Sequence, residues 1–289
     1  MNVLYKILYG LISWLSKTSE PKEGVLCDFS RIRQEAIPCD VLLIEGRNKA
    51  HNAIKAISSS DWSQAVLYIG RLLDIEDPGL RTIINNYYDC EPDTHLIIET
   101  RIGQGVIVSP LITLEQEHIR ICRPKGLAQN DIQQVIRYAI SRIGTQSDKL
   151  NLFDLTRFFI PWFLFPKSWR MPLFKYNAGQ HTKTASADLI AESFDFVQFP
   201  ILPLVKKSGS NGIQLFRRIP KLCLPIDFDQ SPYFDIIKYP FIDFTNHSSK
   251  SLLPWKGNGV LSGESTDLYL AHQQANLSFS SKEPNISNE

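Results

Sequence analysis

Short apolar runs, each the length of one β-strand, constrain the fold of this chain more than any other feature. They occupy residues 40–46, 65–70, 94–99, 105–109 and 118–124. A continuous apolar run of four to eight residues is typical of a buried strand, whereas a helix needs a longer segment with a wider period. The first half of the chain therefore predicts a sheet.

Three other segments carry apolar residues at helical spacing, namely 48–58, 130–143 and 186–199. Gly144 stands where the second helix would close, and Pro200 follows the third, so we expect that proline to end it. We find no internal repeat. Strands concentrated early in the chain and followed by helices predict an α+β fold rather than a doubly wound one.

The two ends of the chain differ from its middle. Residues 1–16 are apolar with helical spacing, so we expect an amphipathic helix within residues 1–20, ahead of a domain at residues 21–255. This helix is too short to span a bilayer comfortably, and no signal-peptide cleavage site follows it. It either packs on the domain or lies in a membrane surface. Residues 256–289 are rich in polar residues and predict a disordered tail, with one weak helical turn at residues 268–272.

Charge and cysteine usage exclude several classes of function. The formal net charge is +1, and we identify no cluster of basic residues, so nucleic acid is not an expected partner. The five cysteines are widely spaced and include no CxxC pair. They predict free thiols in a reducing compartment, with neither a disulfide framework nor a metal site, and we expect no cofactor.

One segment, residues 158–174 (FFIPWFLFPKSWRMPLF), holds seven aromatic residues and three prolines. The prolines exclude a long helix, so the segment is a loop or a broken helix. It either folds over the core or forms an exposed apolar patch, which would indicate a membrane or lipid contact. Residues 1–16 and 158–174 are therefore two candidate membrane contacts.

Four stretches, in order along the chain, resemble one known family. They are residues 40–70 (DVLLIEGRNKAHNAIKAISSSDWSQAVLYIG), 118–161, 185–203 (ASADLIAESFDFVQFPILP) and 225–238 (PIDFDQSPYFDIIK). Together they resemble the permuted, NlpC-related papain-like cysteine hydrolases, in particular the YebB/YiiX-like branch. The resemblance covers about Asp40 to Trp255.

The resemblance implies a permuted papain-like (NlpC-type) fold, with a small antiparallel sheet or barrel packed against helices. It also implies a strand that carries a histidine, a polar residue that orients this histidine, and a nucleophilic cysteine that opens a later helix. Such a helix start and a nearby imidazole lower the pKa of the thiol, and the histidine then acts as general base and acid. Members of the family are thought to cleave amide or ester bonds.

The match places Gln64 (in WSQA) at the histidine position, Glu99 (in THLIIE) at the polar position and Ser186 (in ASADL) at the cysteine position. A carboxamide cannot accept a proton at physiological pH, and a serine hydroxyl depends on a base even more than a thiol does. The family mechanism should therefore be absent. We expect the three residues to converge, with Ser186 at the start of a helix.

We accordingly interpret the chain as a catalytically inactive homologue, a pseudoenzyme that acts as a ligand-binding or membrane-surface module. Its partner would be a small ligand, a peptide or a lipid, and its location cytoplasmic, with a peripheral position at the inner membrane as a further expectation. Two alternatives stay open: a hydrolase that uses Ser186 with an unidentified base such as His181, and a structural protein whose cleft is filled. Ser186 also fits a purely structural role as a helix N-cap.

Overall fold

The computed structural model describes residues 27–101, 104–145, 185–208, 212–240, 259–261 and 268–270. The chain divides into two compact units. Nearly all of the described elements belong to the larger unit, within Val25–Ile242, and two short strands belong to the smaller one, within Asp243–Glu289. Residues 1–16, residues 158–174 and His181 lie outside the described residues.

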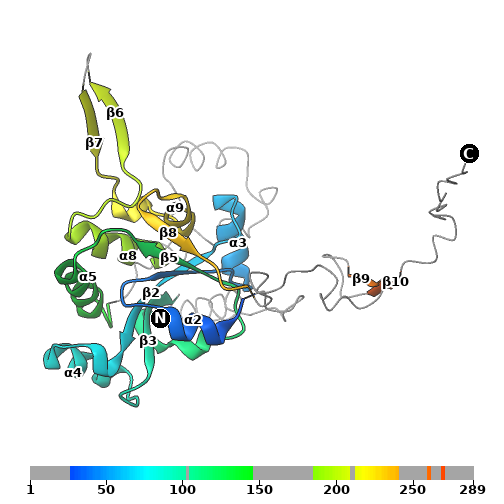
Figure 1. The fold of residues 1–289 in the computed structure, drawn as a ribbon, viewed down its shortest axis with the longest axis horizontal. Coiled ribbons are helices and arrows are strands. Elements are labelled where there is room, and N and C mark those ends of the chain that lie inside the picture. Colours follow the sequence, from blue (N-terminus) through cyan, green and yellow to red (C-terminus); the bar gives the residue numbers. More distant parts are fainter. Residues whose placement is uncertain are drawn as a thin grey trace, which may run out of the picture. The chain divides into compact units, whose positions relative to one another are not determined.

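The larger unit is built on an open six-stranded antiparallel sheet with strand order β4-β3-β2-β1-β5-β8 (Figure 1). Every neighbouring pair in this sheet is antiparallel. The strands are β1 (Val41–Ile44), β2 (Gln64–Arg71), β3 (His95–Arg101), β4 (Gly105–Pro110), β5 (Ile119–Pro124) and β8 (Phe234–Ile237). The chain is thus α+β, and the five strands expected from the apolar runs are present.

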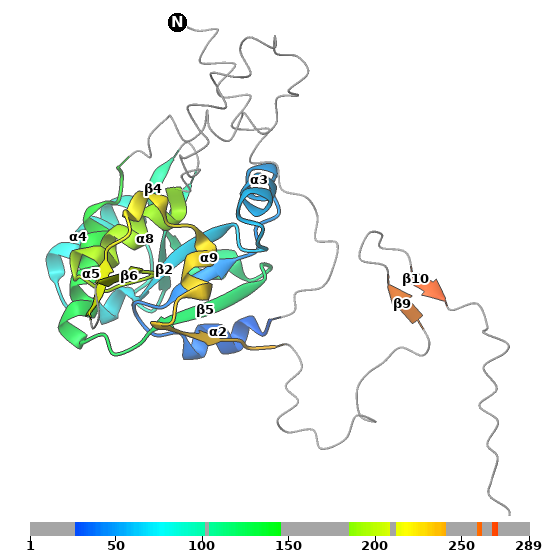
Figure 2. The same cartoon turned by 90° about the horizontal axis from the view of Figure 1, so that it is seen from above.

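Both faces of this sheet are covered, which explains why its strands read as continuous apolar runs. One face carries Leu43, Leu67 and Ile98 and packs against the helices α4 (Pro78–Tyr87), α5 (Gln129–Ser141) and α8 (Ala185–Phe196). The other carries Leu42, Val66 and Ile97 and packs against α2 (Phe29–Glu35) and the 3-10 turn η2 (Leu111–Leu114). We call them the α8 face and the α2 face. Figure 2 shows α5 and α8 on one side of the sheet and α2 on the other.

Side-chain caps fix where three helices begin. Asp28, Asn48 and Asp77 accept hydrogen bonds from backbone N–H groups in the first turns of α2, α3 (Lys49–Ser58) and α4. Each cap satisfies a donor that a helix start leaves without an intrahelical partner.

The end of α8 differs from the expectation that Pro200 stops it. The helix closes at Phe196, because Gln198 adopts a left-handed conformation with φ of 58°. Phe199 N then donates to Phe194 O at 2.9 Å, the bond that closes a Schellman motif.

Several described elements were not anticipated from the sequence. A hairpin of β6 (Leu204–Ser208) and β7 (Gly212–Phe216) projects from the larger unit (Figure 1). It is followed by the 3-10 turn η4 (Pro220–Leu222) and by α9 (Pro225–Gln230), while η1 (Leu72–Asp74) follows β2. In the smaller unit β9 (Gly259–Leu261) pairs with β10 (Leu268–Leu270). The helical turn expected at residues 268–272 is therefore wrong, because strand pairing satisfies this backbone instead.

Candidate functional site

Gln64 and Glu99 lie side by side in the sheet although 35 positions separate them in the sequence. Gln64 opens β2 and Glu99 lies near the end of β3, the neighbouring strand. Gln64 Nε2 donates a hydrogen bond of 2.9 Å to Glu99 Oε2. The structure thus brings together the two residues that the resemblance matches to the histidine and to its orienting partner.

Glu99 is a buried carboxylate, with 4 % of its side chain exposed. Its second oxygen, Oε1, lies 2.8 Å from Arg101 Nη2, two residues along the same strand. Residues i and i+2 of a strand share a face, so this ion pair forms next to the Gln64 contact. Oε2 thus accepts the hydrogen bond from Gln64, whereas the buried Oε1 is in an ion pair with Arg101 but accepts no hydrogen bond of normal geometry within the described part of the chain.

Ser186 is also buried, in the first turn of α8. Because the helix begins at Ala185, Ser186 is its second residue and not its N-cap. α8 packs against β2 and β3, the strands that carry Gln64 and Glu99. Ser186 therefore belongs to the helix that the resemblance implies, and it lies one residue inside the helix start.

Strand alternation separates Ser186 from the other two residues. Gln64 pairs with Ile44, which lies on the α2 face, and Glu99 is two residues from Ile97 on that same face. α8 packs on the opposite face through Ala187 and Ile190. Within the described residues no hydrogen bond joins Ser186 to Gln64 or Glu99. The structure thus brings Gln64 and Glu99 together, but it packs α8, the helix of Ser186, against the other face of the sheet and gives no support to the expected convergence of all three residues.

Three histidines belong to the described residues, and each has its own local contacts. His51, in α3, packs against Gly46, and burial lowers the pKa of its imidazole to about 4. His95 Nδ1 lies 2.6 Å from the Tyr68 hydroxyl, and burial lowers the pKa of that imidazole too. His118 Nδ1 lies 3.0 Å from Glu45 Oε2. None of the three is bonded to Ser186 in this part of the chain.

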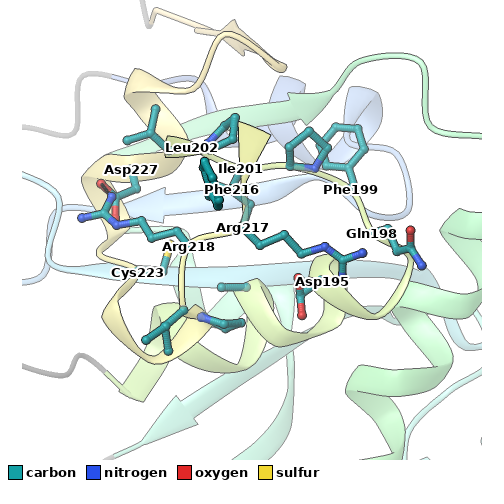
Figure 3. Close-up of a pocket in the computed structure, with 15 residues that line it drawn as sticks. Asp195, Gln198, Phe199, Ile201, Leu202, Phe216, Arg217, Arg218, Cys223 and Asp227 are labelled. Atoms are coloured by element: carbon teal, nitrogen blue, oxygen red, sulfur yellow. Dashed lines mark hydrogen bonds and ion pairs between the residues drawn. The ribbon is translucent and has the colours of Figure 1, made fainter. Parts of the chain in front are cut away.

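A separate pocket of about 250 Å³ opens farther along α8. Figure 3 shows it between the carboxyl-terminal half of α8, the segment that follows this helix, the base of the β6–β7 hairpin and η4. Its apolar walls include Phe199, Ile201, Phe216 and Ile219. Mostly apolar lining with a few convergent polar groups is typical of small-molecule sites, although this pocket is at the small end of their range.

Two ion pairs border the pocket. Arg218 Nη1 lies 3.0 Å from Asp227 Oδ1, and Arg217 Nη1 lies 3.7 Å from Asp195 Oδ1 (Figure 3). Asp227 also accepts a hydrogen bond of 2.8 Å from Leu224 N, so it fixes both the guanidinium and the start of α9. These pairs place two cations and their two carboxylate partners at the edge of the apolar pocket, and the long Arg217–Asp195 pair leaves Arg217 the less tightly held of the two cations.

Cys223, also in the pocket wall, is held as a neutral thiol, because burial raises its pKa well above the ordinary value. The same holds for Cys39 and Cys122, whose pKa values are raised by burial as well. None of the five cysteines, all of which belong to the described residues, forms a disulfide. Such thiols are inert, since the thiolate is the reactive form. Within the described ranges no group of three His, Cys, Asp or Glu side chains is placed to hold a metal ion.

This pocket was not predicted from the sequence. Its walls come from the segment after α8 and from the β6–β7 hairpin, and only the fold brings these parts together. Residues 199–203 (FPILP) combine two prolines with apolar residues, and this pattern is the one signal that could have predicted a rigid apolar segment here.

Comparison with known proteins adds no assignment: the chain matches no model of a known protein family, and no curated protein is significantly similar to it. Nor is any helix among the described residues long and apolar enough to cross a bilayer.

Proposed function

We propose that this chain is a catalytically inactive homologue of the permuted papain-like hydrolases that works as a ligand-binding or membrane-surface module. The observation that carries the proposal is the hydrogen bond between Gln64 and Glu99. At the position that the resemblance gives to the general base, an amide donates to a buried carboxylate. The five cysteines, none of which is in a disulfide, support a reducing compartment and hence a cytoplasmic location.

The contacts of this pair leave no proton acceptor of suitable strength. A carboxamide does not accept a proton near neutral pH, and Glu99 is occupied by Gln64 on one oxygen and Arg101 on the other. A serine nucleophile needs an adjacent base within about 3.2 Å.

The pocket beside α8 supports the ligand-binding part of the proposal. Apolar walls favour a short hydrocarbon or an apolar side chain, and the guanidinium groups of Arg217 and Arg218 at its edge favour a polar or anionic end. An anionic amphiphile of modest length meets both requirements. We therefore assign a small amphipathic molecule as the ligand class.

The inactive assignment is tested with a fluorophosphonate probe on the full-length protein. We expect no labelling of the wild-type chain, and the same background for Ser186→Ala. Stoichiometric labelling that disappears in Ser186→Ala would overturn the assignment, because it would require a base that reaches this hydroxyl.

The ligand-binding part is tested with decanoate, followed by amide chemical shifts in two-dimensional NMR spectra. We expect chemical-shift changes at Ile201, Phe216 and Ile219. Phe216→Ser should weaken decanoate binding about fivefold, because it removes an apolar contact area of roughly half a phenylalanine side chain between protein and ligand. Phe196→Ser is the matched control: Phe196 is similarly exposed but does not line the pocket. Absence of shifts at these residues, or equal weakening in both variants, would refute this ligand site.

A further inference from the structure

The chain as a whole is balanced in charge but contains one basic stretch, so the expectation that its basic residues form no cluster is wrong for this segment. Between Leu204 and Lys221 there are five Lys and Arg residues and no Asp or Glu, whereas the full sequence has 31 basic and 30 acidic residues. The five are Lys206, Lys207, Arg217, Arg218 and Lys221. The stretch coincides with the β6–β7 hairpin and η4, so one projecting element carries this positive charge (Figure 1).

The same element exposes large apolar side chains. The exposed fractions are 58 % for Leu204, 62 % for Val205, 47 % for Phe216 and 61 % for Ile219. Leu204 and Phe216 are partners in the ladder between β6 and β7, so they share one face of the hairpin. Neither outer edge of the hairpin pairs with a further strand among the described residues, because β6 and β7 form a two-stranded sheet of their own. These exposed side chains leave an apolar area in contact with water, and docking would bury that area.

The two arginines at the base of the hairpin have different surroundings. Arg218 is largely buried and pairs with the buried Asp227, so it anchors the hairpin to α9. Arg217 is 61 % exposed, and its pair with Asp195 is long, at 3.7 Å. Lys206 and Lys221 are exposed. The hairpin is thus held at its base by Arg218, while Lys206, Arg217 and Lys221 are exposed to solvent.

We propose that the β6–β7 hairpin with η4, at residues 204–208 and 212–222, is a docking element for an anionic lipid surface. Lys206, Lys221 and Arg217 contact the acidic headgroups. Leu204 and Phe216 from one face of the hairpin, and Val205 from the other, enter the boundary between headgroups and acyl chains. Stable attachment without a spanning helix requires two signals, such as charge and apolar insertion, and this element supplies both. It is distinct from residues 1–16 and 158–174.

The composition of the element favours a bilayer over an acidic protein partner. Protein interfaces are depleted of lysine in their core and need a broad surface of about 800 Å² on each side. A narrow two-stranded hairpin with five-residue strands offers little area of that kind. Basic residues interleaved with aliphatic and aromatic residues on a projecting edge are instead typical of membrane-surface segments.

The test is flotation of the full-length protein with lipid vesicles. One set contains phosphatidylcholine alone, and the other contains phosphatidylcholine mixed with phosphatidylserine. We expect binding to the anionic vesicles only, with a steep loss when salt is raised, because salt screens the headgroup contacts. Each cation near such a surface contributes about a fivefold gain in partitioning, so Lys206→Gln with Lys221→Gln should weaken binding about 25-fold.

Matched controls separate the hairpin from general effects. Lys125→Gln with Arg137→Gln removes the same charge from two exposed sites outside the hairpin and should change binding less than about twofold. Leu204→Ser with Val205→Ser should also weaken binding, whereas Leu73→Ser with Ile112→Ser, which alters exposed apolar residues elsewhere, should not.

Two results would overturn the proposal. One is that the wild-type protein fails to float with anionic vesicles. The other is that the hairpin variants bind as well as their controls while a variant lacking residues 1–16 loses binding, which would assign the membrane contact to the amino terminus. Both outcomes are independent of fluorophosphonate labelling at Ser186 and of decanoate binding, so the inactive-hydrolase proposal can fail or stand separately.

Discussion

Gln64→Glu is the most direct perturbation of the Gln64–Glu99 contact. The two side chains have nearly the same shape, so the substitution replaces the donating Nε2 with a carboxylate oxygen and changes little else. That oxygen would lie about 2.9 Å from Glu99 Oε2, where the amide now donates. A second carboxylate beside a buried one is destabilising, because like charges cannot both stay ionised at this distance.

The size of the effect follows from the distance and the burial. Two unit charges about 3 Å apart interact by roughly 5–6 kcal/mol at an effective dielectric constant of about 20. Gln64 is half-buried, so solvent screens part of this repulsion, and Arg101 offsets part of it from the other side of Glu99. We expect a loss of about 2–4 kcal/mol in the free energy of unfolding at neutral pH.

The pH dependence distinguishes repulsion from a simple packing loss. In the folded variant the pair should share one proton, so the pKa of one carboxyl rises above its value in the unfolded chain. Folding then takes up a proton, and the deficit is largest at neutral pH and shrinks as pH falls toward that of an ordinary carboxyl group. Urea unfolding of the variant and the wild type, measured at several pH values between about 4 and 8, gives the difference directly.

Gln64→Met is the control, because it removes the donor without adding a charge. It leaves Glu99 Oε2 without its hydrogen bond and should cost about 1–3 kcal/mol, with little dependence on pH. If Gln64→Glu destabilises no more than Gln64→Met, or if its deficit does not change with pH, then Gln64 and Glu99 do not form the contact on which the proposed function depends.

Two further predictions concern the surroundings of the site. Asp40 is fully buried and accepts hydrogen bonds of 2.8 Å on each oxygen from Arg123, so Asp40→Asn should destabilise the fold by about 3–5 kcal/mol in urea unfolding. A cost below 1 kcal/mol would contradict the buried pair. In Gly46→Ala, the added Cβ would lie 1.3 Å from His51 Nδ1, so the ring must move out. Its pKa, held at about 4 by burial, should return toward 6.5 in an NMR titration. The variant would then lose the acid destabilisation that a buried neutral histidine imposes as pH falls from about 6.5 to 4. An unchanged low pKa would contradict the packing.

The sheet could be predicted from the sequence because strands that are buried on both faces are continuous apolar runs. Val41–Ile44 and Ala65–Ile69 are apolar throughout, since alternate side chains enter the α8 face and the α2 face. The β6–β7 hairpin does not appear as two such apolar runs, because its described side chains are exposed and include Lys206. Its one local signal is the glycine-containing turn sequence between two short runs, which a lone hairpin shares with many loops.

The candidate site could be predicted only in part. The proximity of Gln64 to Glu99 was inferred from the resemblance, and the β2–β3 register places both residues on the α2 face. The side of the sheet on which α8 packs is a tertiary property, and periodicity within the helix does not determine it. For this reason the position of Ser186 relative to the pair could not be derived from the sequence.

Three of the residues on which the resemblance rests have structural tasks in the described fold. Trp62 is buried and lies under the Arg120 guanidinium, with 4.5 Å from its carbon to the ring centroid. Ser63 is buried and accepts a hydrogen bond of 2.9 Å from Gly46 N, which ties the entry of β2 to the end of β1. Asp227 caps α9 and binds Arg218.

Each of these contacts would be needed for folding whether or not the chain performs chemistry. The resemblance in these motifs is therefore evidence about architecture, and evidence about activity must come from the positions where the chemistry would occur. At those positions stand an amide bonded to a buried carboxylate and a serine in the first turn of a helix on the other face of the sheet. A framework held by such contacts can persist without catalysis, and its pocket and projecting hairpin then remain as surfaces for binding.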